Sequence, residues 1–319
     1  MKVLVIRFSS IGDVVLTSPI LRCLKKQQNC TVHYVIKKNY LQVLENNPYV
    51  DRFHSVDRSV NEIIPDLKKE RFDFVFDLQN NLNSFRIKRK IKSVYFTVNK
   101  KNWQKFLLIY FRWNVLNDHV VDRYFECISK AGFHNDHKGL DYHLPPGLSV
   151  DYDVSQSFAV WCLGASHHKK KLTKDQIIEV CNGMTSPIVF VGGPNEKSLA
   201  EEILKKTTHS SVTNLCGSIS LHESAYLVKK SAFVLTNDTG IMHIAAAYQK
   251  KIISFWGCTK PSIGFAPLID QEKSKTLLSK KSNYPCSKHG KYCRYGCSGC
   301  IKDIHPREIS KAIAELDNP

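Results

Sequence analysis

The chain has 319 residues, 43% of them hydrophobic, and its 46 lysines and arginines outnumber 29 aspartates and glutamates to give a formal net charge of +17. This length suits two globular domains, and charged residues interrupt every apolar run before the roughly 18 residues that a membrane-spanning helix needs. The charge excess favours anionic partners such as phosphates, acidic lipids or nucleic acid.

The N-terminal residues 1–8 lack the apolar core and small-residue cleavage site of a signal peptide, so we expect a first strand there and a cytoplasmic protein. Eleven cysteines, an odd number mostly scattered through the periodic segments, suit a reducing compartment better than a disulfide framework.

Short segments rich in Val, Ile and Phe alternate with helical patterns along the chain, which is typical of parallel strands joined by crossover helices. The pattern restarts after a Pro-Pro-Gly stretch near residue 146, and a last helix is predicted from Pro306 to Leu316. We therefore predict an α/β protein with two Rossmann-like domains, 1–150 and 151–319, facing each other across a cleft. The predicted strands are residues 3–8, 32–36, 53–56, 72–78, 93–98, 158–163, 187–193, 212–215, 232–236 and 251–257.

The segment FVLTNDTGIMHIAAA, residues 233–247, joins a strand to a helix through a tight Asn-Asp-Thr-Gly turn. The N-terminus of such a helix offers free backbone N–H groups and the positive end of the helix dipole, which together favour a phosphate. Gly240 allows close approach of a ligand, Thr239 adds a hydroxyl, and His243 lies one turn into the helix. The alternative is that Asp238 or Thr239 only caps the helix and that His243 is a packed core residue.

The segment RFSSIGDVVLTSP, residues 7–19, leaves the first predicted strand and carries Asp13. A carboxylate at a cleft mouth can act as a general base toward an attacking hydroxyl. A capping aspartate is the alternative. Ser18-Pro19 is itself a good helix start, whereas a helix running from Asp13 through Pro19 would be kinked, and the pattern does not decide between them.

Two further loops follow predicted strands. The loop GASHHKKKLT places the Ser166 hydroxyl and the Lys170 ammonium at the carboxyl end of a strand, where a lysine can neutralise a diphosphate leaving group. A solvated charge run is the alternative for the three lysines. In GGPNE, the glycines permit close approach of a ligand, and Glu196 either accepts hydrogen bonds from a ribose or only begins a helix.

Six stretches, in this order along nearly the whole chain, resemble glycosyltransferase family 9, which contains the ADP-heptose:lipopolysaccharide heptosyltransferases. The resemblance implies a GT-B fold and inverting transfer of heptose, or a similar sugar, from a nucleotide-diphosphate-sugar, with ADP-heptose as the expected donor. It implies a lipopolysaccharide core or other lipid-linked saccharide as acceptor, and no required metal or cofactor. The stretches are RFSSIGDVVLTSPILRCLK, ENNPYVDRFHSVD, RFDFVFDLQNNLNS, GGPNE, NLCGSISLHESAYLVKKSAFVLTNDTGIMHIAAA and FWGCTKPSIGFAP.

Carried over by this resemblance, Asp13 is the base that deprotonates the acceptor hydroxyl. The remaining matches are donor-binding positions: Ser166, Lys170, Glu196, Ile219, Asp238, Thr239, Gly240, Ile241 and His243.

The sequence also departs from the family. The family often shows Trp-Pro or Leu-Pro after the donor lysine, whereas this chain has Lys171-Leu172-Thr173, so Lys169 and Lys171 are rivals of Lys170. Gln79 and Asn83 stand where histidine and arginine are usual in the family. Both lie in the half that handles the acceptor, so the identity of the acceptor is left open. A basic cluster in the N-terminal half either meets acidic groups of the acceptor or is a solvated face: Arg86, Lys88, Arg89 and Lys90.

Four cysteines crowd the segment 286–300: Cys286, Cys293, Cys297 and Cys300. Thiolates at this density can close a tetrahedral zinc site, but only Cys297 and Cys300 have the C-x-x-C spacing, so we expect free thiols and no metal.

The resemblance places the enzyme at the inner face of the cytoplasmic membrane, where anionic lipid accounts for the basic charge. The competing hypotheses are a GT-B enzyme for a different nucleotide sugar, a nucleotide-sugar epimerase, a catalytically inactive homologue and a basic nucleic-acid-binding protein. The last leaves the Asp13 and Asp238 loops unexplained.

Overall fold

Two parallel β-sheets, each with helices packed against it, make up the chain in the computed structural model, which describes residues 1–296 and 299–317. The chain divides into two units, Met1–Asn102 with Asp118–His143, and Trp103–Asn117 with Leu144–Pro319. Among the described residues, no helix combines the length and the apolarity needed to span a bilayer.

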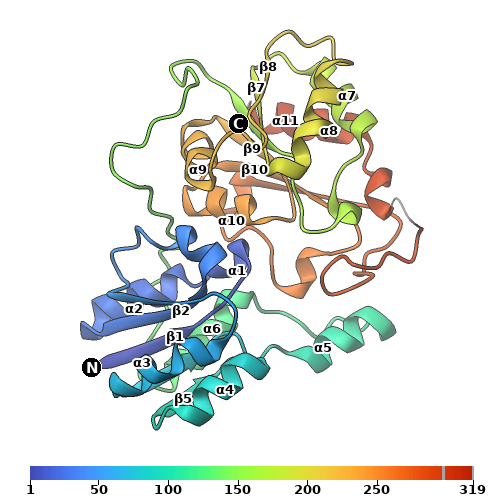
Figure 1. Ribbon diagram of the computed structural model, residues 1–319. Coiled ribbons are helices and arrows are strands. Elements are labelled where there is room, and N and C mark those ends of the chain that lie inside the picture. Colours follow the sequence, from blue (N-terminus) through green and yellow to red (C-terminus); the bar gives the residue numbers. More distant parts are fainter. Residues whose placement is uncertain (297–298, 318–319) are drawn as a thin grey trace. The chain divides into compact units, whose positions relative to one another are not determined.

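The first unit is built on a five-stranded sheet in the order β3-β2-β1-β4-β5, and every pairing in it is parallel (Figure 1). Central strand β1 is buried along almost its whole length, which is why it reads as a continuous apolar run. The strands are β1 (Lys2–Ile6), β2 (Thr31–Lys37), β3 (Arg52–Val56), β4 (Phe74–Asp77) and β5 (Val94–Thr97). The helices are α1 (Ile11–Val15), α2 (Ser18–Gln28), α3 (Ile64–Lys69), α4 (Leu82–Lys90), α5 (Asn102–Phe106), which runs into the second unit, and α6 (Val120–Ser129).

The second unit is built on a six-stranded parallel sheet in the order β11-β10-β9-β6-β7-β8. The strands are β6 (Ala159–Cys162), β7 (Ile188–Val191), β8 (Val212–Asn214), β9 (Phe233–Asn237), β10 (Lys251–Trp256) and β11 (Ser274–Leu278). The helices are α7 (Lys174–Gly183), α8 (Lys197–Leu204), α9 (Leu221–Lys230), α10 (Gly240–Ala247) and α11 (Pro306–Asp317).

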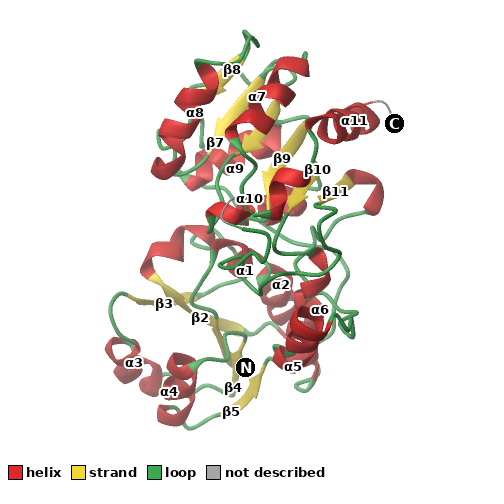
Figure 2. Cartoon of the chain, turned by 90° about the vertical axis from the view of Figure 1, so that its right-hand side faces the viewer, coloured by secondary structure: helices red, strands yellow, loops and turns green. Residues whose placement is uncertain are grey.

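Helices cover both faces of the second sheet. Buried residues of α7, α8 and α11 share one apolar cluster with Trp161 and Phe255 of the sheet. Helices α9 and α10 contact each other and lie on the other side of the strands (Figures 1 and 2). The helix predicted near the C-terminus is confirmed as α11, and its Ile309 and Leu316 are buried in that cluster.

All ten predicted strands are present, and β11 is an additional one. It is an edge strand of partly exposed residues in the sequence SKTLL, so it lacks the apolar run that marks a buried strand.

The strand order reverses once in each sheet, between β1 and β4 in the first and between β6 and β9 in the second. In open parallel sheets, ligands bind outside the carboxyl ends of the strands at such a reversal, because the loops from the two neighbouring strands diverge there. Ligands are therefore expected to bind at four loops, which follow β1, β4, β6 and β9.

Two buried histidines of the first unit, on the neighbouring strands β2 and β3, contact each other. His33 Nδ1 lies 2.9 Å from His54 Nε2, and the two rings stack with centroids 5.2 Å apart. Burial lowers the pKa of both imidazoles, and the pKa of His54 falls to about 4. Because the unfolded chain has histidine pKa values near 6.5, it binds more protons than the folded chain as the pH drops below that value.

The free energy of unfolding should therefore fall between pH 6.5 and pH 4. In His54→Gln, the amide keeps a hydrogen bond to His33 without titrating, so the loss of stability from pH 7 to pH 5 should be smaller than in the wild type. Urea unfolding at the two pH values measures this difference. An equal loss in both proteins would show that the histidine pair does not cause it.

Candidate active site

Two loops meet at the reversal of the second sheet, and Asn237 joins them. This residue ends β9 and is 2% exposed. Its amide nitrogen donates to the carbonyl oxygens of Leu163 and Gly164, at 3.2 and 3.3 Å, and its amide oxygen accepts from the Leu172 backbone N–H at 3.3 Å. The loop after β6 is thus held against the turn after β9.

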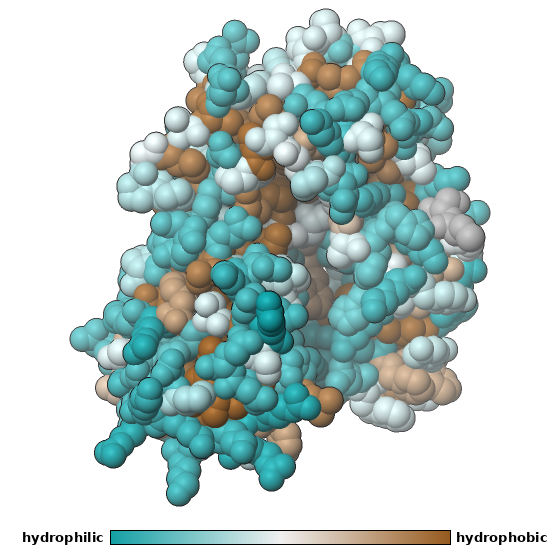
Figure 3. Space-filling view, in the orientation of Figure 1, coloured by the Kyte–Doolittle hydropathy of each residue, from teal (hydrophilic) through white to brown (hydrophobic). Residues whose placement is uncertain are grey.

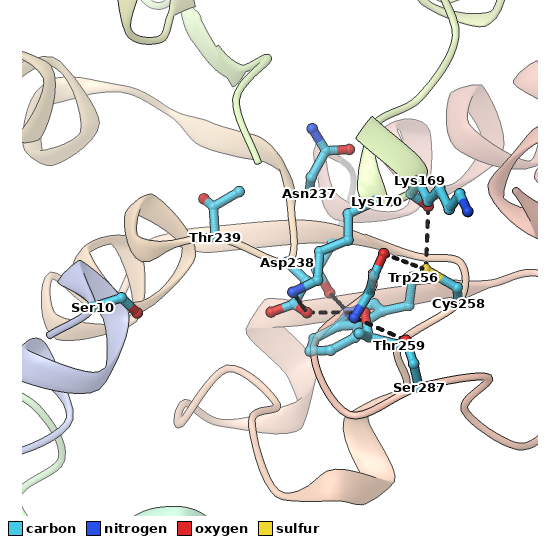
Figure 4. Close-up of polar contacts among 12 residues, drawn as sticks. Ser10, Lys169, Lys170, Asn237, Asp238, Thr239, Trp256, Cys258, Thr259 and Ser287 are labelled. Carbon is cyan, nitrogen blue, oxygen red and sulfur yellow. Dashed lines mark hydrogen bonds and ion pairs between the residues drawn. The ribbon is translucent and has the colours of Figure 1, made fainter. Parts of the chain in front are cut away.

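An ion pair lies at this junction. Lys170 Nζ is 2.5 Å from Asp238 Oδ2, and the Thr259 hydroxyl donates to the same oxygen at 2.9 Å (Figure 4). The side chains of Lys170 and Asp238 are 10% and 13% exposed, so solvent screens the pair weakly. The result is a cation fixed beside the turn that precedes α10.

The three consecutive lysines have separate positions. The Lys169 ammonium lies over the ring of Tyr292, 6.0 Å from its centroid, and Lys171 Nζ is 2.5 Å from Glu196 Oε1. Of the three, Lys170 is the one whose ammonium reaches the turn at Asp238.

The contacts of this turn do not fit a simple helix cap. Thr239 occupies the N-cap position of α10, but its side chain makes no capping hydrogen bond, and its hydroxyl lies 3.4 Å from the Thr236 hydroxyl. The Asp238 carboxylate is engaged by Lys170 and Thr259. The helix begins at Gly240, and His243 is buried one turn in. With no side-chain cap in place, the first-turn N–H groups of α10 suit an anionic ligand.

Glu196 fills the space beside Gly192 and Gly193. Its Oε2 accepts from the Gly193 N–H at 2.9 Å, and a Cβ on Gly192 would lie 2.9 Å from the Glu196 Cβ, so a larger residue at 192 would force a shift. Glu196 thus ends a 3₁₀ turn, Pro194–Glu196, in addition to pairing with Lys171. Of the other predicted positions of this unit, Ser166 is exposed on the loop after β6, Ile219 is half-buried on the loop between β8 and α9, and Ile241 is buried in α10.

Asp13 follows β1 in the first unit and lies in the short helix α1. It is the third residue of α1, and Pro19 falls inside the first turn of the separate helix α2, so no kinked helix forms. Its Oδ1 is 2.5 Å from Arg7 Nη2, and its Oδ2 accepts from the Ser10 hydroxyl at 2.9 Å. The carboxylate is 20% exposed, so it is oriented by protein groups and still reaches solvent.

Arg7 was not predicted from sequence, although it ends the apolar run that marks β1. Its guanidinium donates to the carbonyl oxygens of Ser9 and Leu78, both at 2.9 Å, and so joins the loops after β1 and β4. Thr259 was missed as well. Thr259 lies shortly after β10, and its position beyond the end of a predicted strand could have marked it as a candidate site residue.

The basic cluster on α4 contains one buried lysine. Lys88 Nζ lies 2.7 Å from Oδ2 of fully buried Asp77 and donates to the Thr97 hydroxyl at 2.7 Å, so its charge is used inside the fold. Three other basic residues of the cluster are exposed: Arg86, Arg89 and Lys90. At the start of α4, an open hollow of about 380 Å³ is lined by Asn81, Leu82, Asn83 and Arg86.

Known proteins share this architecture. A crystal structure of a glycosyl transferase family 9 protein from Veillonella parvula superposes with a TM-score of 0.79, at 19% identity over 99% of this chain and 96% of that chain. The Escherichia coli heptosyltransferase WaaC with ADP superposes with a TM-score of 0.74, at 18% identity over 99% of this chain and 100% of that chain. The two Rossmann-like sheets, and the superposition of nearly the whole chain on these structures, show that the protein has the GT-B fold.

The family follows from the sequence comparisons. The model of glycosyltransferase family 9 (heptosyltransferase) matches residues 60–296. A lipopolysaccharide heptosyltransferase 1 from Campylobacter coli is 22% identical over 99% of both chains. The chain belongs to glycosyltransferase family 9 and is a glycosyltransferase, which confirms the resemblance and the GT-B fold predicted from sequence.

Proposed function

We propose that this enzyme transfers heptose from ADP-heptose to the core of lipopolysaccharide or a similar lipid-linked saccharide, with inversion at the anomeric carbon. The observation that carries the proposal is the Lys170–Asp238 pair beside the uncapped start of α10. The relative from Campylobacter coli is named a lipopolysaccharide heptosyltransferase, and the Escherichia coli structure contains ADP.

In this proposal the second unit binds the donor. The diphosphate lies at the N-terminus of α10, where backbone N–H groups and the helix dipole stabilise it. Lys170 supplies a positive charge that Asp238 and Thr259 have already positioned, so little reorganisation is needed as negative charge develops on the leaving group. Glu196 and Ile219 flank the nucleoside, and Ser166, Gly240, Ile241 and His243 complete the donor site.

Asp13 acts as the general base in the first unit. It takes the proton of the acceptor hydroxyl as the hydroxyl oxygen attacks the anomeric carbon, and the bond from that carbon to the diphosphate oxygen breaks, releasing ADP. Arg7 and Ser10 orient the carboxylate so that one oxygen can face the acceptor. Inversion requires the acceptor hydroxyl, with Asp13 beside it, to approach one face of the sugar while the diphosphate leaves from the other, and no metal or other cofactor takes part in the transfer.

The acceptor is anionic in this proposal. The hollow at the start of α4 and the exposed residues Arg86, Arg89 and Lys90 offer hydrogen bonds and positive charge to its phosphates or acidic sugars. Lys88 is left out of this set because its ammonium is buried against Asp77.

Substitutions should separate donor binding from chemistry. Asp13→Asn keeps the size of the side chain but removes the base, so turnover should fall by about 10²- to 10⁴-fold. The affinity for ADP should change by less than about twofold, since Asp13 contacts no part of the nucleotide in this proposal. Lys170→Ala removes a charge-assisted contact to the diphosphate and should weaken ADP binding by about tenfold or more. Titration calorimetry with ADP and a nucleotide-release assay measure the two effects.

Lys171→Ala is the matched control, because its ammonium pairs with Glu196 rather than with Asp238. It should weaken ADP binding less than Lys170→Ala does. Thermal melting of each variant reports whether the fold is retained, which matters for Asp13→Asn because it leaves the guanidinium of Arg7 without its carboxylate. Equal weakening of ADP binding in the Asp13 and Lys170 variants would contradict the assigned roles.

We further propose that the enzyme works at the cytoplasmic face of the membrane and contacts it through the segment 103–113. Leu108 packs with Leu116 and Ile263, so one side of the segment is anchored in the second unit. Four large aromatic side chains of the segment are at least half exposed, and Figure 3 shows brown, hydrophobic atoms where α5 lies in Figure 1. Aromatic rings suit the boundary between lipid and water, and a net charge of +17 favours anionic lipid headgroups. The exposed aromatic residues are Trp103, Tyr110, Phe111 and Trp113.

The double variant Trp103→Ser/Trp113→Ser should bind vesicles containing anionic phospholipid at least about tenfold more weakly, since each buried ring contributes on the order of 1.5–3 kcal/mol. Co-sedimentation measures this binding. Val94→Ser, at an exposed apolar residue of β5, should bind like the wild type. Unchanged vesicle binding by the double variant would exclude this segment as the contact.

A further inference from the structure

A cluster of buried thiols lies outside the proposed catalytic groups. The sulfur atoms of Cys286, Cys293 and Cys300 all lie within 4.8 Å of one another, and each residue is at most 4% exposed. Cys258, from the loop after β10, is fully buried and packs into the same cluster. Cys297 lies outside the described residues.

We propose that Cys286, Cys293 and Cys300 bind a structural zinc ion. Zinc binds thiolate sulfur at about 2.3 Å in a tetrahedral arrangement, which sets neighbouring sulfurs roughly 3.8 Å apart, and the three thiols need only small movements to reach it. Sulfur ligands select zinc over magnesium or calcium, and the burial of the three residues fits a closed, structural site. Among the described residues, Cys258 is buried in the same cluster but lies outside the trio of mutually close sulfurs, so its side chain would have to move to supply a fourth ligand.

The positive charge of Lys260 beside the cluster suits bound thiolates. Lys260 is 1% exposed, and its ammonium donates to the Ser279 carbonyl oxygen at 3.0 Å while interacting electrostatically with Cys258, Cys286 and Cys300. Three or four thiolates carry more negative charge than one zinc ion neutralises. A buried ammonium beside them offsets the excess, and this gives Lys260 a reason to be buried.

The cysteine loop also supports the donor-site lysine. Gly290, between two of the proposed ligands, has φ +82°, and a Cβ placed on it would lie 2.7 Å from Lys170 Cε. The Cys258 thiol lies 3.5 Å from the Lys169 carbonyl oxygen (Figure 4). It also lies 3.7 Å from the carbonyl oxygen of Gly290. A zinc ion that fixes this loop would therefore hold the aliphatic part of Lys170 in place. This consequence rests on the proposed donor-binding role of Lys170, whereas the metal site itself does not.

Metal analysis of the purified full-length chain tests the site. Inductively coupled plasma mass spectrometry should find about one zinc per chain in protein prepared without added metal or metal-affinity resin. Cys293→Ala and Cys300→Ala should lose most of it. Cys181→Ala is the matched control, because it removes an equally buried thiol from α7 in the same unit and should keep the full zinc content. Iron in place of zinc, or a zinc content near zero, would overturn the proposal.

A second measurement covers the case in which the cysteine variants fail to fold. Removal of zinc from the wild-type enzyme by a strong chelator should lower its melting temperature and weaken ADP binding severalfold, and added zinc should reverse both effects. Zinc that is present but whose removal leaves both quantities unchanged would overturn the structural role. Failure to transfer heptose, with the zinc content intact, would count against the proposed function alone.

Discussion

All strands of each sheet run in the same direction, and this constraint determines where the enzyme can assemble its chemistry. The carboxyl ends of parallel strands gather at one edge, and the loops that leave them diverge where the strand order reverses. The second sheet places Lys170 after β6 and Asp238 after β9, on the two sides of its reversal. The first sheet places Asp13 after β1, where Arg7 joins that loop to the one after β4. Residues far apart in the sequence are neighbours for this reason.

The ion pair between Lys170 and Asp238 is a preorganised charge rather than a large source of stability. Taking both groups largely out of water costs free energy that their attraction only partly repays, so such pairs are weak evidence for stability. The contacts around the pair serve its geometry: Thr259 holds the carboxylate, Asn237 holds the loop, and Gly290 lies against the lysine stem. A group held in this way can stabilise a departing diphosphate without first being ordered.

The fold could be predicted well from sequence, because buried parallel strands are long apolar runs and the alternation with helices is regular. Edge strand β11 was missed, since an exposed strand carries no such signal. The choice among Lys169, Lys170 and Lys171 could not be made from sequence, because three identical side chains are distinguished only by their tertiary contacts. Lys88 was grouped with its exposed neighbours for the same reason, and only its contact with Asp77 separates it from them. The proximity of Cys258 to Cys286 was not predicted. The two residues are well separated in the sequence, and only the folded loop after β10 brings them into one cluster.

In the proposed function, the first unit supplies a carboxylate base and the second supplies a cation and a helix N-terminus, and transfer needs both. The most direct measurement of this joint action is ADP release in the presence of a panel of nucleotide sugars, each with and without a lipid-linked oligosaccharide core. ADP release that requires both ADP-heptose and the acceptor, with heptose found on the acceptor, is the predicted result. Release of nucleotide together with a free epimerised sugar in the absence of acceptor would contradict it.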